Sequence, residues 1–226
     1  VMVLSASSPS ALSESGNSYE YFSKQAIFAV LGLFAMWFIS KVDYRFYQKY
    51  AKIAYIVAAV LLIAVLLVGR EVNGATRWLY VTDTLSFQPS ELVKLLMIIF
   101  YAAILVKNRD DLGKYCKGFI KHCLLLGPII LLLILEPHFS ASIVIIGIVC
   151  IMMIMAGCKF WHFLVTGATV GIPAIIALII TSGYRLQRVV TFLDPWKYAT
   201  DEGWQVIQSL YAIGSGGLFG AGLGES

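Results

Sequence analysis

Long apolar runs alternate with short polar segments along the chain, and the lengths of the runs predict membrane-spanning helices. The hydrocarbon core of a bilayer is about 30 Å thick, so a spanning helix needs about 20 mostly apolar residues. After an apolar stub, VMVLSASS, and a polar segment up to Tyr21, such runs cover 25–40, 53–69, 89–106, 122–136, 140–156 and 163–180. Counting the stub, the pattern predicts seven spans, with the chain cut inside its first helix.

The basic residues between the spans are divided unevenly, and this division predicts the orientation in the membrane. One side carries Lys41, Arg45, Lys49, Lys52, Lys107, Arg109, Lys114, Lys117, Lys121 and Lys159. The other side carries Lys24, Arg70, Arg77, Arg185, Arg188 and Lys197, and Lys94 lies inside a span. Because Lys and Arg are enriched in cytoplasmic loops, the segments 5–23, 70–88, 136–139 and 181–226 are predicted to be extracytoplasmic.

These patterns predict an all-α fold with two parts. Residues 1–181 are expected to form a polytopic transmembrane helical bundle, and residues 182–226 a large extracytoplasmic loop with a re-entrant or amphipathic helix and a Gly-rich segment. The composition agrees, because 59% of residues are apolar, 13% are charged and the mean hydropathy is +0.82. The net charge of +4 does not indicate nucleic acid, since the basic residues lie in short loops. The four cysteines form no CxxC pair and are expected to be free thiols.

The sequence FQPSELVK places an ionisable pair at the start of the fourth span. Pro89 suits the first turn of a helix, because its missing N–H costs nothing there. A spacing of three puts Gln88, Glu91 and Lys94 on one helix face, so that Glu91 and Lys94 can pair. An ionisable residue inside a span costs about 2.5 to 3.5 kcal/mol on insertion scales. The pair is therefore expected in the bundle interior, either as a structural ion pair or in a functional role.

Two further groups of polar and aromatic residues lie in predicted outer segments. In NGATRW, Arg77 supplies a cation and Trp78 a flat ring at headgroup level. The segment is either an interfacial anchor or a platform that stacks against a sugar or holds an anionic headgroup. Arg185 and Arg188 are three residues apart and either anchor lipid headgroups or bind the oxygens of a diphosphate. Asp194, which precedes a proline, is more typical of a turn or cap than of a catalytic base.

The C-terminal part of the chain combines an amphipathic pattern with many glycines. The segment from Glu202 to Leu210 predicts a short amphipathic helix, and the Gly-rich segment after it offers exposed N–H groups that can bind an anion. The motifs GxGxxG after a strand, GxxxxGK[ST] and HExxH are absent from the sequence, which argues against a nucleotide site and a zinc peptidase. His138, between two spans, is expected to cap the second of them.

Taken in order, seven segments of the chain resemble the SEDS family (shape, elongation, division and sporulation), which includes FtsW, RodA and SpoVE. The segments are VMVLSASS, NGATRW, FQPSELVK, LEPHFSAS, FLDPW, GWQVIQSL and AIGSGGLFGAGLGES. They span essentially the whole chain. His138, where many members carry Asp, makes the chain more similar to the FtsW and SpoVE branch. The resemblance implies a ten-span enzyme of the bacterial plasma membrane that polymerises lipid II, the undecaprenyl-diphosphate-linked disaccharide-pentapeptide, during division, elongation or sporulation.

The resemblance also implies a partner and a mechanism. Members work with a class B penicillin-binding protein, which supplies the transpeptidase. No cofactor is certain, and a divalent cation is left open. An Asp acts as general base on the acceptor sugar hydroxyl while the polyprenyl diphosphate leaves, and cations stabilise the leaving charge. In the family this Asp follows the Gly-Leu-Gly-x-Ser stretch, and no Asp of this sequence matches it. The 226 residues are therefore expected to lack the base, which lies beyond Ser226, and to be inactive alone.

The resemblance assigns substrate-binding roles to residues of all the polar segments. Arg77 and Trp78 are expected at the cavity, with Gln88, Glu91 and Lys94 inside it; Arg185 and Arg188 are expected near the diphosphate, and Gln205, Gln208, Ser209, Gly216 and Gly217 in the outer loop. No metal ligand is predicted. Two alternatives stay open. A lipid II flippase also needs an internal ion pair and a polar cavity, although its polar groups should face both sides. A non-catalytic division scaffold has no need of ionisable residues inside a span.

Overall fold

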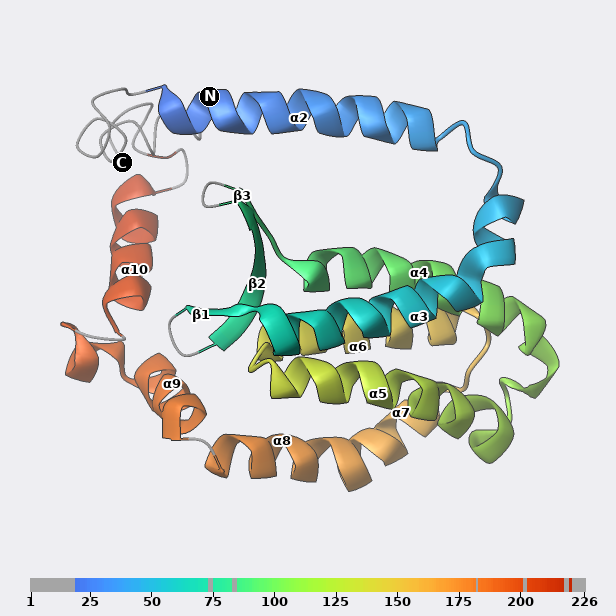
Figure 1. The fold of residues 1–226 in the computed structure, drawn as a ribbon. Coiled ribbons are helices and arrows are strands. Elements are labelled where there is room, and N and C mark those ends of the chain that lie inside the picture. The colour runs from blue at the N-terminus through green and yellow to red at the C-terminus, as the bar shows by residue number, and fades with distance from the viewer. Residues whose placement is uncertain are drawn as a thin grey trace. The chain divides into compact units, whose positions relative to one another are not determined.

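A computed structural model describes residues 19–72, 75–82, 85–181, 183–200, 203–217 and 220. The chain divides into two compact units. Asp43–Val170 is called the bundle unit here, and Val1–Val42 together with Gly171–Ser226 is called the terminal unit. Figure 1 shows the elements of both units as ribbons.

The bundle unit is built from helices that pack side by side around an apolar core (Figure 1). Helix α3 packs against α4 and α5, and α6 packs against the same two helices. The buried side chains at these contacts include Leu62, Met97, Ile129 and Ile145. The helices are α3 (Tyr44–Val68), α4 (Pro89–Lys107), α5 (Lys121–Leu135), α6 (Phe139–Met155) and α7 (Phe160–Thr166), with a 3-10 turn η1 (Arg109–Asp111) and a π-helical turn η2 (Tyr115–Ile120) between α4 and α5.

Two tyrosine hydroxyls connect helices inside this core. Tyr101 Oη donates to the carbonyl oxygen of His122 at 2.7 Å, and Tyr55 Oη donates to the carbonyl oxygen of Leu125 at 2.9 Å. Both acceptors belong to α5, whereas the donors lie on α4 and α3. A buried phenol needs such a partner, because water cannot supply one in an apolar interior. The two bonds therefore fix the position of α5 against its neighbours.

Helix α3 begins earlier than the apolar run predicts. Asp43 precedes its first residue, Tyr44, and Asp43 Oδ1 accepts a hydrogen bond from the Arg45 N–H at 2.8 Å. An Asp at this position satisfies a backbone donor that the helix itself cannot pair. The predicted basic hairpin over 41–52 is therefore wrong from Tyr44 onward, where the basic residues lie on the first turns of the helix. Helix α4 begins at Pro89, as predicted.

Residues 70–87 contain a small antiparallel sheet where the sequence predicts a loop. Strands β1 (Arg70–Val72), β2 (Ala75–Thr82) and β3 (Leu85–Phe87) pair in the order β1-β2-β3, with Leu79 opposite Phe87. Strand β2 contains Thr, Trp, Tyr and Val, which favour strands. It contacts α3 and α4, so the sheet lies where α3 ends and α4 begins. The predicted turn at Asn73–Gly74 lies outside the described residues.

Among the described residues, five helical segments are long and apolar enough to cross a membrane: Tyr21–Ile39, Tyr44–Val68, Pro89–Lys107, Tyr115–Leu135 and Phe160–Ala177. A sixth apolar helix, Phe139–Met155, has 17 residues. At 1.5 Å per residue it is about 26 Å long, close to the thickness of a bilayer core. The six helices match the six apolar runs of the sequence. The predicted N-terminal stub of a seventh lies outside the part of the chain that the structure describes.

The terminal unit contains α2 (Glu20–Ile39) and, after Gly171, the elements α8 (Ile172–Ile180), α9 (Gly183–Leu193), η4 (Pro195–Tyr198) and α10 (Trp204–Gly216). The π-helical turn η3 (Gly167–Gly171) leads into α8. Helix α10 lies where the sequence predicts a short amphipathic helix, and α9 is a further helix. Helix α10 contacts η4 through the rings of Trp196 and Tyr211, whose centroids are 5.8 Å apart. Gly203 lies so close to η4 that a Cβ there would be 2.4 Å from the Pro195 carbonyl oxygen.

Candidate substrate-binding site

One end of the bundle unit gathers polar side chains that the helices bury. Here α4 begins, α5 ends and α6 begins, and the sheet lies beside them (Figure 1). Of the six buried polar or charged residues described in the chain, four are at this end. They are Ser90, Glu136, His138 and Ser142, and the half-buried Gln88 lies beside them. We refer to these five residues as the polar end of the bundle unit.

Gln88 and His138 join the beginning of α4 to the beginning of α6. The Gln88 amide lies 2.5 Å from His138 Nε2. His138 Nδ1 accepts a hydrogen bond from the Ala141 N–H at 3.4 Å, which confirms the predicted cap of α6. The Gln88 atom that lies 2.5 Å from the ring is the amide nitrogen Nε2, and the tautomer of the ring decides which of its two nitrogens donates. His138 thus orients Gln88.

Glu136 directly follows α5, and only 1% of its surface is exposed. Neither its Oε1 atom nor Ser90 Oγ has a hydrogen-bond partner among the described residues. Burial raises the pKa of the Glu136 carboxyl from 4.5 to about 7, because the charged form loses its hydration. A carboxyl with this pKa is partly protonated at neutral pH and can donate as well as accept. In the described structure, both groups are therefore unpaired polar groups enclosed within the polar end.

Glu91 and Lys94 form the predicted ion pair on the first two turns of α4. Lys94 Nζ lies 2.7 Å from Glu91 Oε2, and both belong to one helix at a spacing of three. The pair therefore does not lock two helices together. Their exposure differs, at 58% for the Glu91 side chain and 24% for that of Lys94. The prediction of an interior position is wrong for Glu91 within the described structure, because no described helix covers this side of the first turn.

Trp78 and Arg77 lie next to each other on β2. The Trp78 ring is partly open, with an exposure of 37%, and its residue pairs with Arg70 on β1. Because β2 contacts the end of α3 and the beginning of α4, Trp78 belongs to the same end of the bundle unit as Gln88. The side chain of Arg77 is not among those that the structure describes, so its role stays a prediction.

Arg185 and Arg188 belong to the terminal unit, on helix α9. Their spacing of three places their Cα atoms on one side of the helix, as the sequence predicts. The guanidinium groups themselves fall outside the described side chains. Asp194 directly precedes the turn η4, at the cap position, but its side chain forms no cap hydrogen bond.

The other predicted residues of the terminal unit lie on α10. Gln205, Gln208 and Ser209 are exposed, and Ser209 Oγ donates to the Gln205 carbonyl oxygen at 2.8 Å. Gly216 is the last residue of the helix. Gly217 follows it with a φ of 53°, a conformation that glycine adopts without strain at a helix end. The three polar residues share the exposed surface of α10 with Trp204, Leu210 and Ile213.

Glu136, Ser90 and Ser142 are polar-end residues that the sequence did not single out. Glu136 stands at the end of an apolar run, where a carboxylate would ordinarily face water. Its burial depends on how α5 and α6 pack, and only its position beside a predicted cap residue hinted at it. No group of three or more His, Cys, Asp or Glu side chains that could hold a metal occurs in the described ranges. The four cysteines are free, as predicted.

The helices and the polar end define the class of this protein. It is a multi-pass helical membrane protein whose polar residues gather where its spanning helices begin and end. A sequence profile for FtsW, RodA and SpoVE, described as a cell cycle protein, matches residues 1–226. The chain belongs to this family, which confirms the resemblance noted in the sequence.

Curated relatives match the chain over its full length. The probable peptidoglycan glycosyltransferase FtsW of Coxiella burnetii is 39% identical over 228 residues, covering 100% of this chain and 61% of the relative. Stage V sporulation protein E of Bacillus subtilis is 35% identical over 228 residues, covering 100% of this chain and 62% of the relative. The chain thus spans about three-fifths of the length of these relatives.

Solved structures have the same fold. A chain described under structural coordination of polymerization and crosslinking by a peptidoglycan synthase complex has a TM-score of 0.70 and 31% identity, covering 87% of this chain and 57% of that chain. The rod shape determining protein RodA of Thermus thermophilus has a TM-score of 0.57 and 26% identity, covering 80% of this chain and 57% of its own. Both similarities support the polytopic helical fold.

Proposed function

We propose that the protein is a peptidoglycan glycosyltransferase that polymerises lipid II into glycan strands. The observation that carries this proposal is the similarity of the whole chain, at 36–39% identity, to relatives named as probable peptidoglycan glycosyltransferases. The chemistry of the polar end supports it. Lipid II combines an apolar chain, an anionic diphosphate and hydroxyl-rich sugars, and the bundle unit offers a complementary group for each.

The diphosphate is proposed to bind near Lys94. Its ammonium group lies 2.7 Å from Glu91 Oε2, and the Lys94 side chain is 24% exposed, so an anion can reach it. Helices α4 and α6 begin at the same end, and helix N-termini favour negative charge. Positive groups at this place stabilise the charge that develops on the leaving diphosphate. Arg185 and Arg188, on α9 of the terminal unit, are proposed separately as substrate-binding residues.

The sugars are proposed to contact the polar end. Gln88 is half-buried and contacts His138, so its amide is proposed to bond a sugar hydroxyl. Trp78 offers a partly exposed ring for stacking. Further substrate-binding residues are proposed to be Arg77 on β2 and, in the terminal unit, Gln205, Gln208, Ser209, Gly216 and Gly217. No general base is assigned to any of these residues.

The polar end is proposed to face the extracytoplasmic side of the plasma membrane. The division of basic residues supports this orientation, since the larger set lies at the opposite ends of the spans. Residues 182–226 are then an extracytoplasmic segment beyond the membrane bundle. A class B penicillin-binding protein is proposed as the partner, supported by the similarity to a chain from a peptidoglycan synthase complex.

A reconstitution experiment tests this proposal. The full-length protein is placed in liposomes with the partner, and labelled lipid II is assayed for polymer and for movement across the bilayer. Lys94→Ala is expected to lower polymerisation about 100-fold, the size typical of losing one charged group that stabilises a transition state. Lys159→Ala, an exposed residue at the other end, is expected to leave the rate unchanged.

Each alternative has its own outcome in this assay. Lipid movement without polymer would establish a flippase instead. Neither polymer nor movement from a folded, partner-bound protein would favour a scaffold. Equal polymerisation by the Lys94→Ala and wild-type proteins would remove Lys94 from the site while leaving the activity itself intact.

A further inference from the structure

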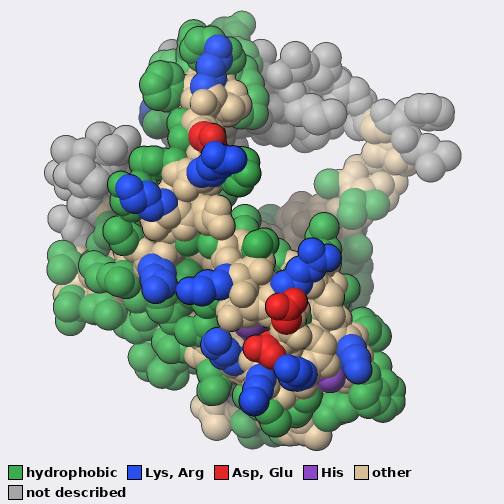
Figure 2. Space-filling model, turned by 90° about the vertical axis from the view of Figure 1, so that its right-hand side faces the viewer, with side chains coloured by type: hydrophobic (Ala, Val, Ile, Leu, Met, Phe, Trp, Pro, Cys, Tyr) green, Lys and Arg blue, Asp and Glu red, His purple; other side chains and the backbone are tan. Residues whose placement is uncertain are grey.

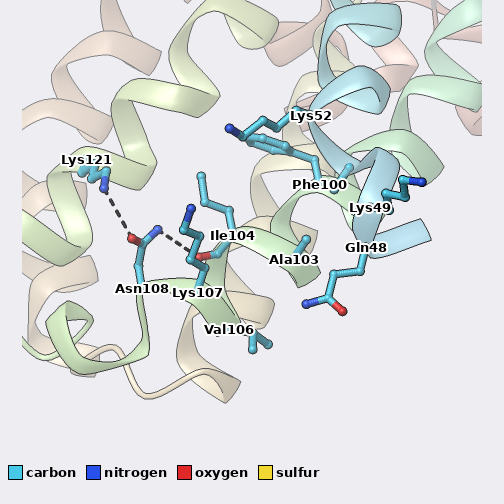
Figure 3. A pocket seen from close by; sticks show the side chains of 11 residues that line it. Gln48, Lys49, Lys52, Phe100, Ala103, Ile104, Val106, Lys107, Asn108 and Lys121 are labelled. Carbon is cyan, nitrogen blue, oxygen red and sulfur yellow. Dashed lines mark hydrogen bonds between the residues drawn. The ribbon is translucent and has the colours of Figure 1, made fainter. Parts of the chain in front are cut away.

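The opposite end of the bundle unit carries a pocket lined by basic side chains (Figure 3). It has a volume of about 540 Å³ and lies between the beginning of α3, the end of α4 and the beginning of α5. Its polar lining consists of Gln48, Lys49, Lys52, Lys107, Asn108 and Lys121. Ammonium groups are strong donors to anionic oxygens, and several around one cavity suit a phosphate.

The positive charge of this pocket is not neutralised by its own lining. Among the described lining residues none is acidic. Asp111, three residues after Asn108, is already paired with Lys114 at 2.7 Å. Figure 2 shows Lys and Arg side chains gathered on this face, with few acidic ones between them. An imbalance of this kind attracts an anion and raises its local concentration.

Three lysines from three helices supply the charge. Lys52, Lys107 and Lys121 extend to the same side of the pocket in Figure 3. The Asn108 side chain forms two hydrogen bonds within the protein. Its Nδ2 donates to the Ile104 carbonyl oxygen at 2.9 Å, and its Oδ1 accepts from Lys121 Nζ at 3.5 Å. The side-chain amide of Asn108 therefore serves the protein itself, and the ammonium groups are the partners for a ligand.

The rest of the lining is apolar and leads to the surface that faces lipid. Phe100 and Ile104 form part of the wall, and Val106 lines the pocket while 69% of its surface is exposed. Ile53 and Ile56, on the adjoining stretch of α3, are 53% and 59% exposed. Because α3 and α4 span the membrane, these side chains lie among acyl chains. The pocket thus opens where headgroups meet hydrocarbon.

We propose that this pocket binds the phosphate headgroup of an anionic phospholipid whose acyl chains lie on the exposed faces of α3 and α4. Basic pockets between spanning helices on the cytoplasmic side recognise such headgroups. A soluble phosphate would bind the lysines but would not contact the apolar wall, whereas a phospholipid would contact the lysines with its headgroup and the apolar wall with its acyl chains. The site lies at the other end of the spans from the proposed lipid II site. Its cytoplasmic position rests on the orientation proposed above, but the binding itself does not.

Native mass spectrometry of the full-length protein in detergent tests the proposal. Dioleoylphosphatidylglycerol is the probe, dioleoylphosphatidylcholine is the neutral lipid with the same chains, and glycerol 3-phosphate is the headgroup without chains. Lys52→Gln, Lys107→Gln and Lys121→Gln are combined in one variant. A matched control combines Lys41→Gln, Lys117→Gln and Lys159→Gln, which removes the same charge from exposed positions outside the pocket.

Phosphatidylglycerol is expected to bind the wild-type protein in preference to phosphatidylcholine. Each lysine contributes about fivefold, so the pocket variant is expected to bind about 100-fold more weakly, and the control within about threefold of wild type. A third variant, with Arg at the three pocket positions, is expected to retain binding, which separates loss of charge from loss of folding. Because no lipid II is used, the result is independent of the glycosyltransferase activity.

Three results would overturn the proposal. Equal losses in the pocket variant and the control would mean that the lipid responds to general surface charge. Equal binding of phosphatidylglycerol and phosphatidylcholine would mean that the acyl chains alone account for binding. Displacement of phosphatidylglycerol by an equal concentration of glycerol 3-phosphate would identify a soluble phosphate as the ligand.

Discussion

The Glu136 carboxyl makes the stability of the bundle unit depend on pH in a direction opposite to that of most acidic residues. Glu136 lies between α5 and α6 with 1% of its surface exposed, and its Oε1 atom has no hydrogen-bond partner among the described residues. Burial raises its pKa from 4.5 to about 7. Replacing this carboxyl by an uncharged group of the same shape, Glu136→Gln, removes the titration and leaves the packing nearly unchanged.

The sign of the effect follows from proton binding. Between pH 4.5 and about 7 the folded protein holds a proton on Glu136 that the unfolded chain releases. The free energy of unfolding therefore falls as the pH rises through this window, and it stays low above pH 7. A shift from 4.5 to about 7 corresponds to roughly 3 kcal/mol at 1.36 kcal/mol per pKa unit. For a chain of this size that is a change in Tm of about 6–12 °C.

Thermal unfolding of the full-length protein in detergent, measured from pH 4.5 to 8, checks this reasoning. The wild-type Tm is expected to decline across the window relative to that of Glu136→Gln, so that the variant is the more stable protein at pH 8. Asp110→Asn, which removes an exposed carboxyl in the same unit, is the control and is expected to follow the wild type. Parallel curves for wild type and Glu136→Gln, or a variant less stable than wild type at pH 8, would show that the carboxylate is charged and partnered in the fold.

Three substitutions probe the packing that positions the two ends. Tyr101→Phe removes the hydroxyl that donates to the His122 carbonyl at 2.7 Å. The loss is expected to lower the free energy of unfolding by about 1 kcal/mol and the Tm by about 2–4 °C. An unchanged Tm would mean that this hydrogen bond contributes nothing to stability. Gly118→Ala would bring a Cβ within 2.2 Å of the Asp111 carbonyl oxygen, so little folded protein is expected by size-exclusion chromatography, and a normal yield would contradict this contact. His138→Ala removes the cap of α6 and is expected to cost about 1 kcal/mol, whereas His138→Asp should restore stability; equal melting of the two would argue against capping.

The spans could be predicted because their lengths are dictated by the bilayer and their apolar character by lipid contact. The start of α3 could not be predicted from hydropathy, because it depends on a single cap, Asp43, ahead of a polar first turn. The sheet was missed for a related reason. Three short strands are stable only when they rest on something, and β2 does so by contacting α3 and α4, which the local sequence does not reveal.

In the candidate site, too, contacts within one helix could be predicted from the sequence, whereas contacts between distant segments could not. The pairing of Glu91 with Lys94 and the capping by His138 follow from spacing along one helix, and both were predicted. The contact of His138 with Gln88 joins residues 50 positions apart, and the burial of Glu136 requires α5 and α6 to meet; neither has a local signal. The predictions for the arginines of β2 and α9 concern side chains outside the described ones and stay predictions.

The apolar core of the bundle unit separates its two ends, so a substitution at one end is expected to leave ligand binding at the other end unchanged. Lys94 and Lys107 belong to one helix, 13 residues or about 20 Å apart, and the buried residues between them include Met97 and Tyr101. Changes at sites this far apart, with no shared partner, combine additively in free energy. Lys94→Ala is therefore expected to leave phosphatidylglycerol binding at the basic pocket within about twofold of wild type, measured in the same mass-spectrometric titration. A larger change would mean that α4 moves as one rigid element, so that an anion bound at one end alters the position of the lysine at the other.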